Sequence, residues 1–407
     1  MSTARNVPLA RFLVQASSRS WKGAPDPCLQ PLEGRPAVVH TLERVAARWP
    51  ALGVTLVAPA FDREGPFPGL APRIAPARFA RLFAHDGDPL ARLVDATADL
   101  PAGALVARCD GQHPFVDLDV TEALAACATA EGLDCAKLPD DFPPAFASEV
   151  YRVGALRRLA AALHPARDAA LRAYPRHAAC RAESGLRWRH FPPPRYAPAR
   201  LHAWRRAARA LYDTPRAEGD PAHRQAAGDQ SRFHYELAAA HLASDFRVLE
   251  AACGDGGGTR FLAERVAEVV AVDLARGQLP RLAGLRARRW PVRAVVADVS
   301  RLPFPTGRFD AVTSFETLEH TVDPEACLAS FARVLRPGGV LVLSTPQSSL
   351  GAVPLNPHHH REFSLDELRA LVTARFRIHE LIGIKAGRIV VPGDPVGNNT
   401  VMVCERR

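Results

Sequence analysis

Compact apolar runs alternate with amphipathic segments along the first half of the chain. Three short apolar runs predict buried strands: Arg11–Ala16, Val54–Pro59 and Ala104–Arg108. Three longer segments space their apolar residues at helical intervals and predict helices: Pro36–Trp49, Leu90–Asp99 and Val120–Glu131. Strands that alternate with helices in this way predict an α/β sheet with crossover helices.

A change of pattern separates this half from the rest of the chain. The proline-rich stretch 191–198 is followed by an amphipathic segment, Leu201–Tyr212, which predicts a helix. Beyond it the sequence is rich in turn formers and poor in large apolar residues. We therefore predict one domain over residues 8–213, a linker over 214–229 and a second domain over 230–407.

The strand–helix rhythm restarts at Arg232. Apolar runs predict five strands: Arg247–Ala251, Val269–Val272, Val292–Ala297, Ala311–Phe315 and Gly339–Ser344. Amphipathic segments predict four helices: Phe233–Leu242, Thr259–Val266, Pro324–Leu335 and Ser364–Val372. Strands separated by single helices predict a doubly wound, parallel sheet, so the fold class expected for both domains is α/β.

Composition narrows the class of protein. The 407 residues exceed one ordinary core, and no run of eighteen apolar residues predicts a membrane span. The N-terminus lacks the pattern of a signal peptide, so we expect a cytoplasmic protein. The eight cysteines form no CxxC pair, which agrees with a reducing compartment and predicts no metal site.

The net charge of +9 comes largely from one stretch. Residues 151–230 contain 16 Arg, no Lys and six acidic residues. Such a basic belt fits a phosphorylated substrate or an anionic membrane surface, although solvated arginines in an Arg-rich sequence are the favoured interpretation. No recognised nucleic-acid-binding module accompanies this charge, so we expect no nucleic-acid partner.

Residues that could bind a ligand are concentrated at the start of the second domain. The segment VLEAACGDGGGT, residues 248–259, runs from a predicted strand into a predicted helix. Gly254 and Gly256 let the backbone approach a ligand closely, and the helix start offers unpaired N–H groups. Glu250 at the strand end is suited to accept hydrogen bonds from an ammonium group.

Two more acids end later strands. Asp273 follows VVAV and could accept both hydroxyls of a ribose, whereas Asp298 follows RAVVA and could accept from an adenine amino group. Taken singly, such acids are as often helix caps and such glycines often only turn the chain. Their ordered combination favours a nucleoside site. A dinucleotide site is disfavoured, since Thr259 and Phe261 stand where its fingerprint needs Gly or Ala.

These motifs, with RLPFPTGRFDAVTSFETLEH at 301–320 and NPHHHREFSLDELRALV further on, resemble class I S-adenosylmethionine-dependent methyltransferases of the type 11 group. The resemblance spans about 230–400 and implies a Rossmann-like fold with S-adenosylmethionine as cofactor. It implies that the cofactor is bound by Glu250, Ala252, Gly254, Gly256, Asp273, Leu274, Asp298, Val299, Phe315 and Glu316. Ala252 replaces a common glycine, and because alanine is small we expect little harm from it.

Histidines follow these motifs. Methyl transfer requires alignment of the acceptor and exclusion of water, and an alcohol or amine acceptor also benefits from a base. His320 is the candidate base, although a role in capping or orienting its loop is the favoured alternative. The run His358–His360 suggests a metal, but three consecutive side chains do not easily converge on one ion, so we interpret it as part of a substrate-covering loop.

The first domain resembles cytidylyltransferases of the CMP-sugar-synthetase and spore-coat-polysaccharide type over roughly residues 10–213. The resemblance rests on LVQASSRSWKGAPDPCLQPLEGRPAVVHTLERV, ALVARCDGQHPFVDLDV and SEVYRVGALRRLA. It implies a nucleotide-sugar-handling fold with damaged chemistry, because Gln112 stands where the family has a magnesium-binding Asp. Lys22 supplies charge near Pro25 and Asp26, and Asp110 or Asp117 could replace the lost acid.

The leading hypothesis is therefore a methyltransferase that acts on a sugar or carrier-linked glycan, phosphorylated and nucleotide-linked forms included, in polysaccharide biosynthesis. The glycan assignment rests on the companion domain and the late histidine-containing segment, and is an analogy. Two alternatives remain open. One is a bifunctional enzyme that also activates a sugar with CTP, and the other is a non-catalytic scaffold of a glycan-assembly complex.

Overall fold

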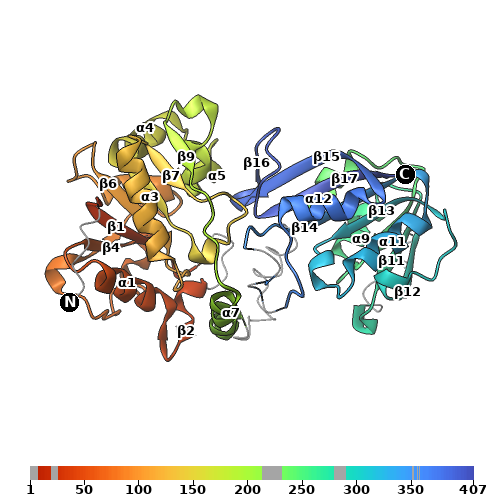
Figure 1. Cartoon of the computed structure of the whole chain (residues 1–407), viewed down its shortest axis with the longest axis horizontal. Coiled ribbons are helices and arrows are strands. Elements are labelled where there is room, and N and C mark those ends of the chain that lie inside the picture. The colour runs from red at the N-terminus through yellow and green to blue at the C-terminus, as the bar shows by residue number, and fades with distance from the viewer. Residues whose placement is uncertain are drawn as a thin grey trace. The chain divides into compact units, whose positions relative to one another are not determined.

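The computed structural model describes residues 8–19, 26–212, 232–278, 290–350, 353–354, 356 and 358–407. The chain divides into two compact units, Met1–Ala217 and Glu218–Arg407 (Figure 1). The predicted linker, residues 214–229, lies outside the described residues, as do Lys22 and Pro25 of the predicted basic loop.

A seven-stranded mixed sheet forms the first unit, in the order β5-β4-β1-β6-β8-β7-β9. Its strands are β1 (Arg11–Gln15), β4 (Gly53–Ala58), β5 (Phe79–Phe83), β6 (Leu105–Asp110), β7 (Cys135–Lys137), β8 (Glu149–Arg152) and β9 (Trp188–His190), with β2 (Pro31–Leu32) and β3 (Arg35–Pro36) in a separate hairpin. Four of them, β5, β4, β1 and β6, run parallel, whereas β8 is antiparallel to both neighbours.

Helices connect the strands of the first unit. They are α1 (Ala37–Arg48), α2 (Pro89–Asp95), α3 (Leu118–Ala130), α4 (Val153–Ala162), α5 (Ala169–Ala173), α6 (Pro175–Ala179) and α7 (Pro198–Tyr212). The central strand β1 is buried on both faces, with Phe12, Leu13 and Val14 all 0% exposed. That burial is why the strand reads as a continuous apolar run in the sequence.

An eight-stranded sheet forms the second unit, in the order β12-β11-β10-β13-β14-β17-β15-β16. Its strands are β10 (Arg247–Ala251), β11 (Glu268–Asp273), β12 (Val292–Val296), β13 (Phe309–Phe315), β14 (Leu335–Pro346), β15 (Phe376–Lys385), β16 (Ile389–Val390) and β17 (Asn399–Arg406). The first five are parallel, as predicted, but β17, β15 and β16 pair antiparallel. Both sheets are thus mixed, and the three antiparallel strands of the second sheet were not predicted.

Helices cover both faces of the second sheet. Leu249 and Val270 pack on one face with α11 (Pro324–Val334) and α12 (Leu365–Thr373). Their neighbours Val248 and Val269 point to the opposite face, where they pack against Tyr235 of helix 232–239 and against α9 (Gly257–Ala263). Alternate side chains of each strand therefore pack into two separate cores, one on each face of the sheet. This arrangement is Rossmann-like.

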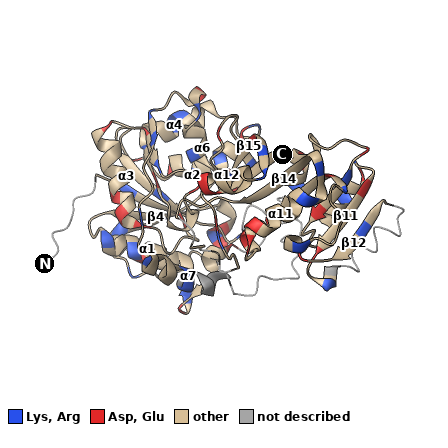
Figure 2. Ribbon diagram, turned by 45° about the vertical axis from the view of Figure 1, so that its right-hand side comes forward, with Lys and Arg blue, Asp and Glu red and all other residues tan. Residues whose placement is uncertain are grey.

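Charged residues of both signs are interspersed over both units (Figure 2). In the basic belt many arginines are held by acids of other segments: Arg158 by Asp134, Arg172 by Asp88, Arg176 by Glu149, Arg189 by Glu131 and Arg200 by Asp117. Pairing of this kind favours the interpretation that much of the belt serves the fold of the first unit. Among the described residues, no helix combines the length and the apolar character needed to cross a bilayer.

Candidate cofactor and acceptor site

The parallel strands place the candidate residues at one edge. In the sheet β12, β11, β10 and β13 are consecutive neighbours and run in the same direction. Their carboxyl ends therefore lie side by side, and the segments that follow them line a common edge. Glu250, Asp273, Asp298 and Phe315 come from these strand ends.

The turn after β10 has a left-handed backbone at three positions. The φ angles are +59° at Ala252, +54° at Gly254 and +83° at Gly256. A Cβ atom at Gly254 would meet nothing within 4 Å, so the space in front of this backbone is open. Alanine is not harmless at Ala252, because a side chain in this conformation is strained. The expectation of little harm considered the size of the side chain and not this backbone angle.

Glu250 is a buried carboxylate whose two oxygens are both satisfied. It is 1% exposed, accepts a hydrogen bond from the Tyr235 hydroxyl at 2.6 Å on Oε1, and accepts another from Thr259 Oγ1 at 2.5 Å on Oε2. Burial raises the pKa of Glu250 to about 7, against the lowering effect of these two donors. The sequence analysis missed Tyr235, whose only signal is its place on the helix before β10.

Asp273 joins the end of β11 to the glycine turn. Its Oδ2 accepts from the Gly254 amide at 2.9 Å, and its Oδ1 accepts from the Ala275 amide at 2.8 Å. Each carboxylate oxygen can accept two hydrogen bonds, so both retain capacity for a ligand hydroxyl. The next residue, Leu274, is 70% exposed, which leaves an apolar side chain at this edge.

Asp298 acts as a helix cap. Its Oδ1 accepts from the Ser300 amide at 2.8 Å and from the Ser300 hydroxyl at 2.7 Å, at the start of a short 3-10 helix, Val299–Arg301. These donors lower the pKa of Asp298. Val299, another predicted cofactor residue, is 9% exposed and belongs to the core beneath α11. Its side chain is therefore held mainly by packing.

Phe315 is the last residue of β13, and Glu316 follows it. The Phe315 ring meets the Tyr235 ring edge to face, with centroids 4.7 Å apart. Glu316 has a φ of +49°, and its Oε1 accepts from Ser344 Oγ at 2.7 Å and from Asn399 Nδ2 at 2.6 Å. These contacts tie the end of β13 to β14 and β17.

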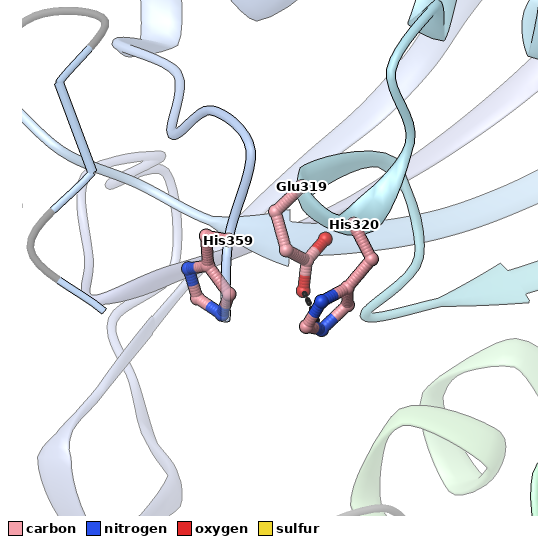
Figure 3. A group of neighbouring side chains, drawn as sticks. All are labelled: Glu319, His320 and His359. Carbon is pink, nitrogen blue, oxygen red and sulfur yellow. Dashed lines mark ion pairs between the residues drawn. The ribbon is translucent and has the colours of Figure 1, made fainter. Parts of the chain in front are cut away.

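His320 lies just beyond, on the 3-10 helix Leu318–His320, and its ring is 47% exposed. Its Nδ1 lies 3.0 Å from the carbonyl oxygen of His358, and burial lowers the pKa of His320. The structure also brings His359 and the buried Glu319 to this point (Figure 3). Of the histidine run, His359 joins His320, and His358 and His360 are not part of this group.

In the first unit the predicted acids have separate partners. Asp110 pairs with the buried Arg108, which also pairs with Glu149. Asp117 caps α3 and accepts from the Tyr196 hydroxyl at 2.7 Å. Gln112 is exposed, and Asp26 caps a short 3-10 helix through the Cys28 amide.

Part of the second unit is similar to known proteins. Residues 249–343 match the family model described as "Methyltransferase domain". A probable S-adenosylmethionine-dependent methyltransferase of Mycolicibacterium smegmatis is 35% identical over 153 residues, which cover 36% of this chain and 58% of that protein. The ubiquinone biosynthesis O-methyltransferase of Xanthomonas oryzae pv. oryzae is 35% identical over 148 residues, covering 32% and 62%.

A solved structure is also similar. The 1,6-didemethyltoxoflavin-N1-methyltransferase of Burkholderia thailandensis, crystallised with 1,6-didemethyltoxoflavin and S-adenosylhomocysteine, is 28% identical with a TM-score of 0.38, covering 53% of this chain and 92% of its own. The chain thus spans about three-fifths of the length of the two curated relatives. Residues 249–343 of the second unit are thus similar to methyltransferase domains, and the curated relatives include one described as S-adenosylmethionine-dependent.

Proposed function

We propose that this chain is an S-adenosylmethionine-dependent methyltransferase. The observation that carries the proposal is the convergence of the glycine turn, Glu250 and Asp273 at the carboxyl edge of adjacent parallel strands, in front of open space at Gly254. A sulfonium nucleoside fits these groups: Asp273 has acceptor capacity for ribose hydroxyls, and the exposed Leu274 offers an apolar surface for adenine. Asp298 and Phe315 extend the same edge on either side.

In the reaction, an oxygen or nitrogen of the acceptor forms a bond to the methyl carbon while the carbon–sulfur bond breaks. The bonding electron pair stays on sulfur, so S-adenosylhomocysteine is the product. The chain's contribution is to align the acceptor and exclude water. The lowered pKa of His320 keeps its ring neutral, and a neutral Nε2 is able to accept the acceptor's proton.

Calorimetric titration of the purified full chain with S-adenosylhomocysteine tests the cofactor assignment. We expect one binding site per chain. Absence of binding to a folded protein would overturn the proposal.

The acceptor that we propose is a sugar or carrier-linked glycan of polysaccharide biosynthesis. Support comes from the resemblance of the first unit to enzymes that handle nucleotide sugars and from the late histidine-containing segment. Formation of S-adenosylhomocysteine with a panel of nucleotide sugars and glycans, compared with a panel of ubiquinone precursors, separates this acceptor class from that of the relative named for ubiquinone biosynthesis. Turnover of ubiquinone precursors alone would contradict it.

For the first unit we propose a degenerate nucleotidyltransferase-like domain that binds or positions a partner. In the order β5-β4-β1-β6, the strands β4 and β5 are added on one side of β1, and the next strand, β6, is added on its other side. Such a switch point is a position where α/β sheets commonly bind ligands. At that point, however, Asp110 is neutralised by Arg108 and Gln112 is a poor magnesium ligand. Incubation with CTP, magnesium and sugars should release no pyrophosphate, and robust release would instead support the bifunctional alternative.

A further inference from the structure

Glu319, His320 and His359 form a cluster of three side chains at the carboxyl edge of the second sheet. One ligand atom from each lies within 4.8 Å of the others, and the two imidazole rings meet at 86° with centroids 4.9 Å apart. Figure 3 shows Glu319 and His320 on one short helical turn, with His359 facing them from a separate loop. Two imidazoles and one carboxylate are a ligand set typical of zinc, manganese and related divalent ions.

We propose that Glu319, His320 and His359 bind a divalent transition-metal ion.

The hydrogen bonds behind the two histidines prepare both rings for this role. His320 Nδ1 lies 3.0 Å from the His358 carbonyl oxygen, which can only accept, so Nδ1 carries the proton. His359 Nδ1 lies 2.8 Å from Glu362 Oε1, and the same reasoning applies. Both Nε2 atoms therefore bear a lone pair. A backbone carbonyl or a carboxylate behind the distal nitrogen is the arrangement found behind metal-bound histidines.

Charge at the cluster favours a cation. Glu319 is 1% exposed and accepts one hydrogen bond from the Thr345 hydroxyl at 2.9 Å. Within the described part of the chain no Lys or Arg pairs with it, and the Nε2 atom of the neutral His320 ring lies 3.9 Å from its Oε1. Glu316 and Glu362 lie near enough to add negative potential. A divalent ion would offset the negative potential of these neighbouring carboxylates.

The loop that carries His359 is anchored where the ion would sit. The His360 amide donates to the Glu319 carbonyl oxygen at 2.7 Å. Ligands 2.0–2.2 Å from a metal lie at most about 4.4 Å apart, so closure around an ion requires only small side-chain movements. The Asn356 amide, which contacts His359 Nε2 at 2.9 Å, would turn away.

This assignment also deepens the proposed function, on which the following step rests. β13 lies between β10 and β14, so the cluster that follows β13 shares an edge with the glycine turn that follows β10. Three protein ligands leave coordination positions open for an acceptor oxygen. A bound cation lowers the pKa of a coordinated hydroxyl, and its proton then passes to solvent. His320 Nε2 cannot both hold the ion and accept that proton, so metal removal separates the two roles.

Titration of the metal-free full chain with Co²⁺, followed by ligand-field absorption and calorimetry, tests the site. We expect one ion per chain in the wild type. In His320→Ala and His359→Ala we expect at least about tenfold weaker binding, the size of effect usual for the loss of groups at metal sites. His358→Ala is the matched control, because its exposed side chain lies outside the cluster and its carbonyl is retained. It should bind Co²⁺ within about twofold of the wild type.

Titration of every variant with S-adenosylhomocysteine shows whether the second unit remains folded and keeps the failures distinguishable. Cofactor binding without Co²⁺ binding in the wild type would overturn the metal site and leave the proposed function standing. Co²⁺ binding without cofactor binding would overturn the proposed function and leave the metal site standing. Equal weakening in His358→Ala and His320→Ala would also overturn the site, because it would indicate adventitious binding by surface histidines.

Discussion

Tyr235 and Glu250 meet at the back of the glycine turn, where the phenol hydroxyl donates to Oε1 at 2.6 Å. The contact joins helix 232–239 to the end of β10 across 15 positions of the chain. The same ring lies over Gly258, where an added Cβ would come within 1.9 Å of it. One tyrosine thus satisfies a buried acid and also sets how closely α9 approaches the preceding helix.

The stability of the second unit should fall as pH rises because of Glu250. Its pKa in the folded chain is about 7, raised from an ordinary 4.5 by burial. Its contribution is therefore fully present below pH 4.5 and is lost as pH rises through about 7. A rise of this size corresponds to roughly 3 kcal/mol. Hydrogen exchange of the β10 amides in increasing urea, at pH 5 and pH 8, measures the effect locally.

Glu250→Gln is the matched comparison, since it keeps the shape of the side chain and removes the titration. The wild type should lose more protection than the variant between the two pH values. An identical loss in both proteins would show that Glu250 does not titrate in this range.

Asp273→Asn should weaken S-adenosylhomocysteine binding at least about tenfold. The amide replaces one acceptor oxygen by a donor, so a hydrogen bond to a ribose hydroxyl or to the Gly254 amide is lost, and a bond to a charged group is worth about 1.5–3 kcal/mol. Asp255→Asn is the control, because Asp255 is in the same turn and accepts only from Gly257 among the described hydrogen bonds. Calorimetry should show a change below about twofold for it. Equal effects would contradict the ribose role of Asp273.

The central strands were predictable from the sequence because each is decided locally. Val269–Val272 was expected and β11 spans Glu268–Asp273, since a short apolar run buried on both faces leaves few alternatives. The long strands β15 and β17 were not predicted. β17 pairs with β14, which lies more than fifty positions earlier. A local sequence pattern does not predict which distant strand will be the partner.

Some residues of the candidate site could likewise be predicted from the sequence, and others could not. Glu250 and Asp273 follow strands at recognisable spacings, so the chemistry of their strand ends could be inferred before the fold was known. Tyr235, Thr259 and His359 acquire their roles only through contacts between separate segments. The strain at Ala252 depends on a backbone angle, which residue size does not reveal.

Gly258→Ala should destabilise the second unit by more than about 2 kcal/mol, because the added methyl group overlaps the Tyr235 ring and a packed core accommodates little extra volume. Gly257→Ala provides the control in the same helical turn, where the nearest atom to a new Cβ is Asp255 Oδ1 at 3.4 Å. Urea denaturation followed by hydrogen exchange of α9 compares the two variants. Tyr235→Ala should partly restore stability to Gly258→Ala, and a wholly additive loss would argue against the close approach.

Ala252→Gly should stabilise the second unit by about 0.5–1 kcal/mol. The gain comes from relief of the left-handed strain at φ +59°, reduced by the greater freedom of glycine in the unfolded chain. Gly254→Ala creates the opposite change two residues later, at φ +54°, and should cost about 1 kcal/mol although the space there is open. Urea denaturation without S-adenosylhomocysteine measures both changes, since a Cβ added at Gly254 would stand in the space proposed for the cofactor. Destabilisation by Ala252→Gly would show that the turn does not hold this conformation in solution.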